Sequence, residues 1–248
     1  MNTNSNTYIF IYASVMVIIV AAVLSTAATL LKDKQLQNVK NEKMSAILAS
    51  TDIESTPETA ETLYNKYITE EWIISSSGEI TDLYKNGNFE KGDKRAFDVN
   101  MKTELFNKSN GEEFNSPLFV CHIENNTYYI IPLLGKGLWG PIWGNLALQS
   151  DFNTVKGVVF DHKGETPGLG AEIVFPAFTN PFVNKTIFDK QGNFTSIKVV
   201  KGGVAKLASA MQIHGVDAIS GGTITSNSVD AMLKNCLENY VPYIKSKK

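Results

Sequence analysis

An uninterrupted apolar segment near the start of the chain constrains its fold more than any other feature. The residues from Tyr8 to Leu31 include no charged side chain. At about 1.5 Å per residue, a helix of this length covers the roughly 30 Å of a membrane's hydrocarbon layer. A cleaved signal peptide is the alternative, because small residues lie between Ser25 and Ala28. The length of the segment and the lack of Lys or Arg before it favour a retained transmembrane anchor over residues 1–31.

The charges around this segment bear on its orientation in the membrane. No basic side chain precedes the segment, whereas several follow it, namely Lys32, Lys34, Lys40 and Lys43. The positive-inside rule then leaves the rest of the chain in the cytoplasm. One short N-terminal tail gives that rule few charges to compare, so the residues alone leave the orientation open.

Composition limits the rest of the chain to one globular domain. Its 248 residues are 43% hydrophobic and 19% charged, which is enough for one sizeable core. A net charge of -2 with interspersed signs gives no basic stripe for nucleic acid. Cys121 and Cys236 lie in apolar patterns without metal-ligand spacing, which predicts buried thiols and leaves a disulfide open. No metal site is predicted from the three histidines, His122, His162 and His214.

The pattern of apolar and turn residues predicts an α+β fold. Helical character continues from Lys32 to Leu48, and Ser55 to Glu58 has the signature of a new helix running toward Glu71, so residues 32–71 are interpreted as a helical stalk and linker. From residue 72 to 248 we expect a twisted antiparallel sheet with peripheral helices, and residues 93–117 are interpreted as an insertion or a long loop. The expected strands are 72–76, 79–84, 118–123, 127–134, 143–149, 154–160 and 196–201.

The segment 214–226, HGVDAISGGTITS, is the most informative for function. It leads into an amphipathic helix from Val229 to Tyr240, for which Thr225 or Ser226 is available as the N-cap. Thr223 therefore lies within one turn of free backbone N–H groups, where an anion such as phosphate is stabilised without a basic side chain. An ordinary helix-capping turn fits the same residues. No lysine stands before Thr223 as in a nucleotide-hydrolase phosphate loop.

These residues resemble the flavinylation motif of the FMN-binding domains in the C subunit of Na+-translocating NADH:quinone reductases and in the G subunit of the related Rnf complexes. In that motif, Asp-x-x-Ser-Gly-Ala-Thr, the last threonine is esterified to the phosphate of FMN, and its position here is Thr223. The chain departs from the motif at Gly222, where alanine is usual; the smaller residue leaves the hydroxyl accessible and makes the turn more flexible. The cofactor-binding residues that the resemblance implies here are Asp217, Ser220, Gly221, Gly222, Thr223, Ile224 and Thr225.

Two further segments, in the same order as in the family, support the resemblance. Residues 135–140 are similar to its Gly-x-Gly-Leu-Trp segment, and residues 164–170 to its Gly-Glu-Thr-Pro-Gly-Leu-Gly loop, while Lys201 begins a third, shorter match. The Leu-Trp pair favours the quinone reductase over Rnf. The family adds these cofactor-binding residues: Leu138, Trp139, Glu165, Thr166, Pro167, Gly168, Leu169, Gly170 and Lys201.

Physical chemistry alone leaves the roles of these two loops open. Trp139 suits a flat ring but equally a buried position in a turn. Glu165 is suited either to tuning a flavin or to capping a nearby backbone group, and Pro167 with Gly168 is a type II turn signal.

The resemblance implies a membrane-anchored flavoprotein subunit of the Na+-translocating NADH:quinone reductase, which relays electrons through covalent FMN and has no catalytic acid or base. Na+ translocation then belongs to partner subunits, and attachment requires a separate flavin transferase that uses FAD and Mg2+. The resemblance also places the flavin domain on the outer, periplasmic side of the bacterial cytoplasmic membrane, against the charge rule. Two alternatives stay open: the G subunit of an Rnf ferredoxin:NAD oxidoreductase, and a non-redox anchored domain that binds a ligand or holds an assembly.

Overall fold

The computed structural model describes residues 5–247. The chain divides into two compact units between Lys43 and Met44. The first unit is helical: α1, Asn6–Ala49, runs without a break through the predicted anchor and the first part of the predicted stalk. Its apolar side chains up to Leu31 are exposed, and the helix is long and apolar enough to cross a membrane. The first four residues of the predicted anchor lie outside the described residues.

The second unit is built on a seven-stranded antiparallel sheet with the strand order β3-β2-β1-β4-β5-β6-β7. Asn86 and Gly87 both have positive φ, as the tight turn of a β-hairpin requires, and they join β2 to β3. The α+β fold with an antiparallel sheet is therefore confirmed. The strands are β1 Ile68–Ser75, β2 Ile80–Lys85, β3 Asn88–Lys91, β4 Asn115–Ile123, β5 Asn126–Lys136, β6 Pro141–Leu148 and β7 Val155–His162.

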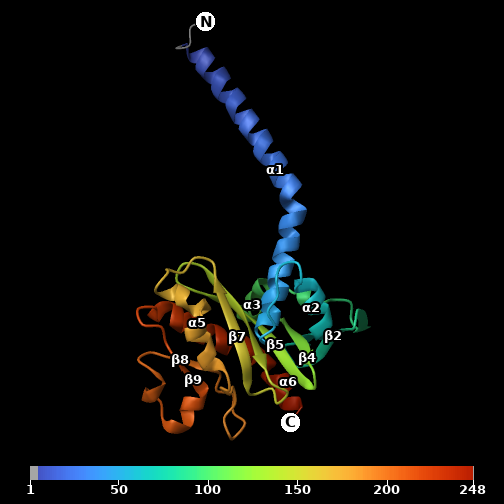
Figure 1. Ribbon diagram of the computed structural model, residues 1–248, viewed down its shortest axis with the longest axis vertical. Coiled ribbons are helices and arrows are strands. Elements are labelled where there is room, and N and C mark those ends of the chain that lie inside the picture. Colours follow the sequence, from blue (N-terminus) through green and yellow to red (C-terminus); the bar gives the residue numbers. More distant parts are fainter. Residues whose placement is uncertain (1–4, 248) are drawn as a thin grey trace. The chain divides into compact units, whose positions relative to one another are not determined.

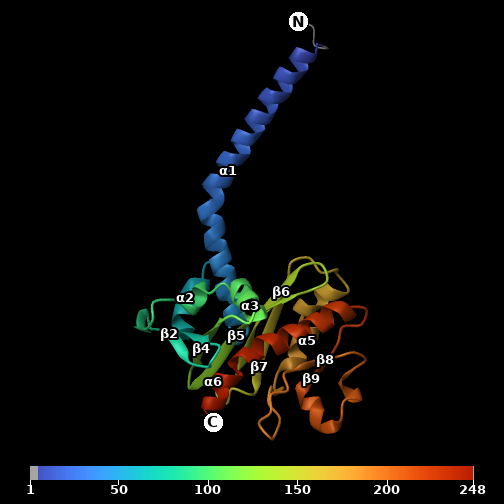
Figure 2. The same ribbon diagram turned by 180° about the vertical axis from the view of Figure 1, so that it is seen from behind.

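Helices cover both faces of this sheet. Figure 2 shows α5 lying across one face, and Figure 1 shows α2 against the other. The α-helices of the second unit are α2 Ala60–Tyr67, α3 Met101–Ser109, α4 Pro176–Thr179, α5 Thr223–Leu237 and α6 Val241–Ser246. Short 3-10 helices lie at Ala96–Asp98, Gly170–Val174, Asn180–Phe182, Val204–Lys206, Ser209–His214 and Glu238–Tyr240.

The central strands are buried on both faces because successive side chains of a strand point in opposite directions. In β4, Leu118 and Val120 join the core beneath α5, whereas Phe119 and Cys121 join a second core. Burying both faces explains why β4 has an unbroken apolar run rather than an alternating one. The second core is closed by α2 and by the last turn of α1, from which Met44, Ile47 and Leu48 are buried.

The strand predicted over residues 196–201 does not belong to the main sheet. Its counterpart β8, Lys198–Val200, pairs in parallel with β9, Gly215–Asp217, in a separate two-stranded sheet. An apolar, β-branched pattern marks a strand but does not specify its partner, and β9 is too short for its pattern to be recognised. The exposed strand β3 is not among the predicted strands either.

Two predictions about where helices lie also need correction. The interpretation of residues 93–117 as a loop is wrong, because α3 lies within it. The side chain of Asn100 accepts hydrogen bonds from the N–H groups of Lys102 and Thr103, and this N-cap is the signal in the sequence that marks the helix. The helix expected from Ser55 toward Glu71 is shorter: α2 begins only at Ala60, after a turn closed by Thr59, and ends at Tyr67.

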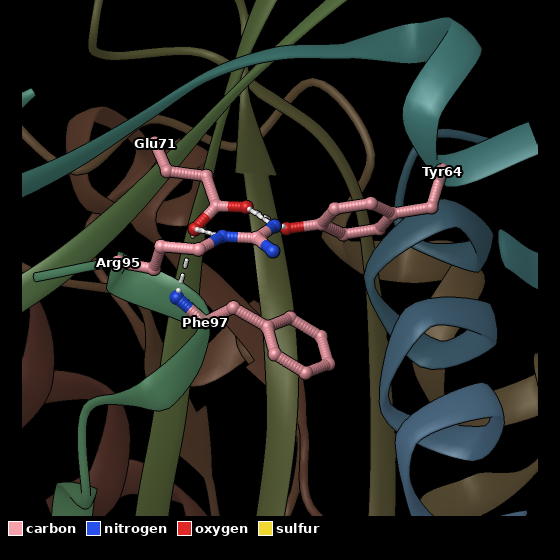
Figure 3. Close-up of polar contacts among 4 residues, drawn as sticks. All are labelled: Tyr64, Glu71, Arg95 and Phe97. Carbon is pink, nitrogen blue, oxygen red and sulfur yellow. Dashed lines mark hydrogen bonds and ion pairs between the residues drawn. The ribbon is translucent and has the colours of Figure 1, made fainter. Parts of the chain in front are cut away.

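The buried carboxyl group of Glu71, which pairs with Arg95, ties strand β1 to α2 and to the segment 95–97. Glu71 on β1 is 3% exposed and forms a salt bridge with Arg95. It also accepts hydrogen bonds from the Tyr64 hydroxyl at 3.0 Å and from the N–H of Phe97 at 3.0 Å (Figure 3). Burial, together with the charge of Glu71, raises the pKa of Tyr64 well above its usual value, so the phenol keeps the proton that it donates.

Removing Arg95 tests this arrangement against a matched surface pair. In Arg95→Met the Glu71 carboxyl stays buried without its cation, and we expect the free energy of unfolding to fall by roughly 3–5 kcal/mol. Lys156 is exposed to a similar extent as Arg95, at 28% against 30%, but its partner Asp52 is 71% exposed. Lys156→Met should therefore cost about 1 kcal/mol or less. Urea unfolding of the detergent-solubilised chain measures both, and equal losses would contradict the assignment.

The two cysteines are free thiols buried on opposite faces of the sheet. Cys121 belongs to the core beside α2, and Cys236 lies on α5 in the other core. Burial raises the pKa of each thiol to about 11. The prediction of buried thiols is confirmed, and the disulfide that the sequence leaves open is absent between these residues.

Thiol labelling tests this placement. At pH 8 the folded chain should react with a thiolate-directed reagent far more slowly than the chain in urea, because both thiols are protonated as well as inaccessible. Unfolding should expose two reactive thiols without added reductant. Fewer than two under those conditions would indicate a disulfide.

Candidate functional site

The glycine turn of the segment 214–226 ends where α5 begins, at Thr223. Gly222 occupies the N-cap position without a side-chain cap, and the first helical hydrogen bond runs from the N–H of Ser226 to the carbonyl of Gly222. The prediction of Thr225 or Ser226 as the N-cap is therefore wrong, because the helix starts before both of them. The N–H groups of residues 223–225 have no partner within the helix, which is the usual condition of a first turn and favours an anion there.

The hydroxyl groups of this first turn differ in what they contact. Thr225 is 2% exposed and donates a hydrogen bond of 2.5 Å to Oε2 of Glu165. Ser226 is fully buried, and its Oγ accepts from the N–H of Ile219 at 3.1 Å. Thr223 is half-buried, and its hydroxyl forms no hydrogen bond with any residue between 5 and 247. Of the three, only the Thr223 hydroxyl is left available for chemistry.

Glu165 connects all three segments that resemble the family. Its carboxyl group is 4% exposed; one oxygen, Oε2, contacts Thr225, and the other, Oε1, accepts from the N–H of Trp139 at 2.9 Å. Its own N–H donates to Nδ1 of His162 at 3.1 Å. Glu165 therefore caps a backbone group, one of the two roles that the sequence leaves open for it.

Three glycines allow these segments to approach closely. A Cβ atom on Gly137 would lie 2.5 Å from Oε1 of Glu165, and one on Gly170 would lie 2.7 Å from Oε2. A Cβ on Gly221 would lie 2.7 Å from the side chain of Leu169, which brings the second loop against the turn before α5. Each contact is too short for a real Cβ atom, so the Glu165 and Leu169 side chains lie this close to the three backbone positions only because glycines occupy them.

The loop that carries Glu165 contains the predicted type II turn. The N–H of Leu169 donates to the carbonyl of Thr166 at 3.1 Å, and Gly168 has a φ of 74°. Pro167 occupies the position before Gly168, as this turn type favours. Thr166, Pro167 and Gly168 are exposed, whereas Gly170 is buried against Thr225.

Large apolar side chains are exposed on the same segments. Trp139 is 68% exposed, which makes the buried position considered for it wrong. Leu138 beside it and Leu169 in the second loop are exposed as well. Leu169 lies against the turn before Thr223, so it offers apolar surface beside that turn, and the exposed side chains of Leu138 and Trp139 add apolar surface on the neighbouring loop.

Asp217 and Lys201 lie at the second sheet, and Ser220 lies in the turn between β9 and α5. Asp217 ends β9, and its Oδ1 accepts from the N–H of Val204 at 2.7 Å, which holds the segment after Lys201 against the motif. Lys201 and Ser220 are exposed. A residue absent from the predicted site, Asp230, accepts from the N–H of Val199 at 2.9 Å and so ties α5 to β8. Asp230 lies two turns into α5, and the sequence shows it on the helix but does not show its partner.

Ile224 differs from the other predicted residues, because it lines a cavity of about 780 Å³ rather than the cluster around Glu165. This cavity runs along α5 toward α3. Its lining includes Lys102 and Leu105 from α3, Lys136 from β5, and Met232 from α5. The structure thus brings most predicted residues together around Glu165 and Thr223, and places Ile224 on an adjoining surface.

Substituting a glycine at the centre of this cluster tests its packing. In Gly170→Ala the new methyl group meets both Thr225 and Glu165, and we expect a loss of roughly 1–3 kcal/mol in the free energy of unfolding from the displaced atoms. Gly164→Ala is the control, since nothing lies within 4 Å of its Cβ position, and it should change stability by less than about 0.5 kcal/mol. Indistinguishable urea midpoints for the two variants would contradict the contact.

Comparisons with known proteins identify the family. Residues 137–238 match the family model of the FMN-binding domain. The C subunit of the Na+-translocating NADH-quinone reductase from Vibrio parahaemolyticus is 32% identical over 223 residues, covering 86% of this chain and 83% of the relative. Its counterpart from Pseudomonas aeruginosa is 30% identical over 240 residues, covering 94% and 91%.

A solved structure agrees with these relatives. The crystal structure of the C subunit of the Na+-translocating NADH-quinone reductase from Parabacteroides distasonis superposes with a TM-score of 0.75 at 38% identity, covering 88% of this chain and 98% of that chain. The chain therefore belongs to the family of C subunits of the Na+-translocating NADH-quinone reductase, a family with an FMN-binding domain.

Proposed function

We propose that this protein is the membrane-anchored flavoprotein subunit of a Na+-translocating NADH:quinone reductase, and that it relays electrons through an FMN joined by a phosphoester to Thr223. The observation that carries the proposal is the Thr223 hydroxyl on the first turn of α5, which has no hydrogen-bond partner among residues 5–247, while its neighbours Thr225 and Ser226 are buried and bonded. That position, taken with family membership, favours Thr223 over every other hydroxyl of the motif.

The surroundings of Thr223 fit both halves of an FMN molecule. The unpaired N–H groups of the first turn of α5 suit a phosphate. Exposed apolar surface on Leu138, Trp139 and Leu169 suits a flat ring. Bound FMN supplies the one-electron redox chemistry, and the chain supplies attachment, orientation and surroundings for it. In this proposal no side chain acts as a catalytic acid or base.

Attachment is a phosphoryl transfer to the threonine. The Thr223 oxygen forms a bond to the FMN phosphorus of FAD while the bond from that phosphorus to the bridging oxygen breaks. AMP leaves with that oxygen, and the hydroxyl proton passes to solvent. We propose that a separate flavin transferase with Mg2+ catalyses this step.

We further propose a single membrane crossing, with residues 1–31 as the anchor, 32–71 as stalk and linker, and 72–248 as the flavin domain on the periplasmic side of the bacterial cytoplasmic membrane. Helix α1 supports the anchor by its length and composition. Because one helix cannot form an ion path, Na+ export belongs to partner subunits of the complex. Covalent attachment suits an exported carrier, because FMN lost there is not readily replaced.

The two alternatives to this proposal make different predictions: one predicts other partner proteins, and the other predicts a protein without the yellow colour of a flavin. The G subunit of an Rnf complex would share the flavin chemistry but co-purify with other proteins, and the relatives reported above carry the reductase name instead. A non-redox anchored domain would carry no flavin at all.

The attachment is tested by mass and colour. The chain produced with a flavin transferase should be yellow and heavier than its sequence by one FMN less one water. Thr223→Ala should be colourless with the unmodified mass, because no other hydroxyl of the turn is both free and on the helix. Thr127→Ala, which removes another half-buried threonine on β5, should keep the adduct. A flavin retained by Thr223→Ala would show that the attachment residue is wrong, and wild-type protein from native membranes without an adduct would overturn the function.

A further inference from the structure

We propose that Glu165 is a positioning residue for flavin attachment, which orients the Thr223 hydroxyl by holding Thr225 from the inside of the domain. This inference rests on the proposed function. It assigns to Glu165 a task that requires no contact with the flavin, because its two carboxyl oxygens are occupied by groups of the chain itself.

Helix geometry links the two threonines. At 3.6 residues per turn, residues two positions apart point to nearly opposite sides of a helix. Fixing Thr225 toward the interior therefore fixes Thr223 toward the exterior. The bond of 2.5 Å from the Thr225 hydroxyl to Glu165 is the side-chain contact that sets this rotation, and Ser226 reinforces it by accepting from the N–H of Ile219.

Glu165 is itself held firmly enough to act as a reference point. Its Oε1 accepts from the backbone of Trp139, its N–H donates to His162, and its carboxyl group is 4% exposed. The carboxyl oxygens also lie against Gly137 and Gly170, where a Cβ atom would be 2.5 Å and 2.7 Å from them. Because these contacts hold the Glu165 side chain in place, its hydrogen bond to Thr225 fixes the orientation of that residue on α5.

Removing either partner of this bond changes the first turn in a defined way. Without the carboxyl oxygen, the Thr225 hydroxyl is a buried donor with no acceptor, and it is stabilised only if the turn rotates or unwinds to reach water or a carbonyl group. The same movement carries Thr223 out of its position. The glycines at 221 and 222 offer little resistance, because this turn has no side-chain cap.

The experiment measures the initial rate of flavin transfer to the purified full-length chain in detergent, with flavin transferase, FAD and Mg2+, and locates the adduct by peptide mass. Glu165→Met removes both acceptor oxygens but keeps a side chain of similar length, so the Thr225 hydroxyl loses its acceptor. Thr225→Val removes the hydroxyl but keeps the shape. We expect each variant to transfer at least tenfold more slowly to Thr223, and we expect Thr225→Ser, which keeps the hydroxyl, to transfer at close to the wild-type rate.

Two controls separate positioning from loss of stability. Arg95→Met weakens the domain at the Glu71 pair, and under conditions where it stays folded it should accept flavin at the wild-type rate. Should Glu165→Met fail to fold, the Thr225→Val and Thr225→Ser pair decides alone. A wild-type rate in either Glu165→Met or Thr225→Val, or a slow Thr225→Ser, overturns the inference. An unmodified wild-type chain would instead contradict the proposed function.

Discussion

The buried carboxyl group of Glu165 is the interaction on which the arrangement of the site depends. A carboxyl group inside a protein requires hydrogen-bond partners for its oxygens, and here the partners come from two other loops, through the N–H of Trp139 and the hydroxyl of Thr225. Satisfying one buried group therefore draws together three segments that lie far apart in the sequence. The glycines that flank it are the steric condition for that approach.

The sheet provides the rigid support for this cluster. Strand β5 runs directly into the loop that carries Trp139, and β7 ends at His162, next to the loop that carries Glu165. Helix α5 completes the support by packing its buried residues, from Val229 to Leu237, on the sheet. The loops of the site are therefore held in position by the two strands and the helix to which they are attached.

The fold class, the family and most of the strands can be predicted from the sequence, because apolar patterns and short motifs are local signals. Predictions from the sequence fail where a residue's role depends on its tertiary contacts. The N-cap of α5 is misplaced because Thr225 and Ser226 look like capping residues, yet both hydroxyls are used by distant or preceding groups. The parallel pairing of β8, and the hydrogen bond from Val199 to Asp230, likewise depend on contacts between distant parts of the chain.

The placement of the two cysteines bears on how this domain matures. Because the sheet separates Cys121 from Cys236, oxidation cannot join them in a disulfide while the domain is folded. The folded state therefore forms without a disulfide and without a disulfide isomerase. The folded domain requires no disulfide in either a reducing or an oxidising compartment. In an oxidising compartment, the chain must instead bury both thiols before they are oxidised, so rapid folding is what protects them.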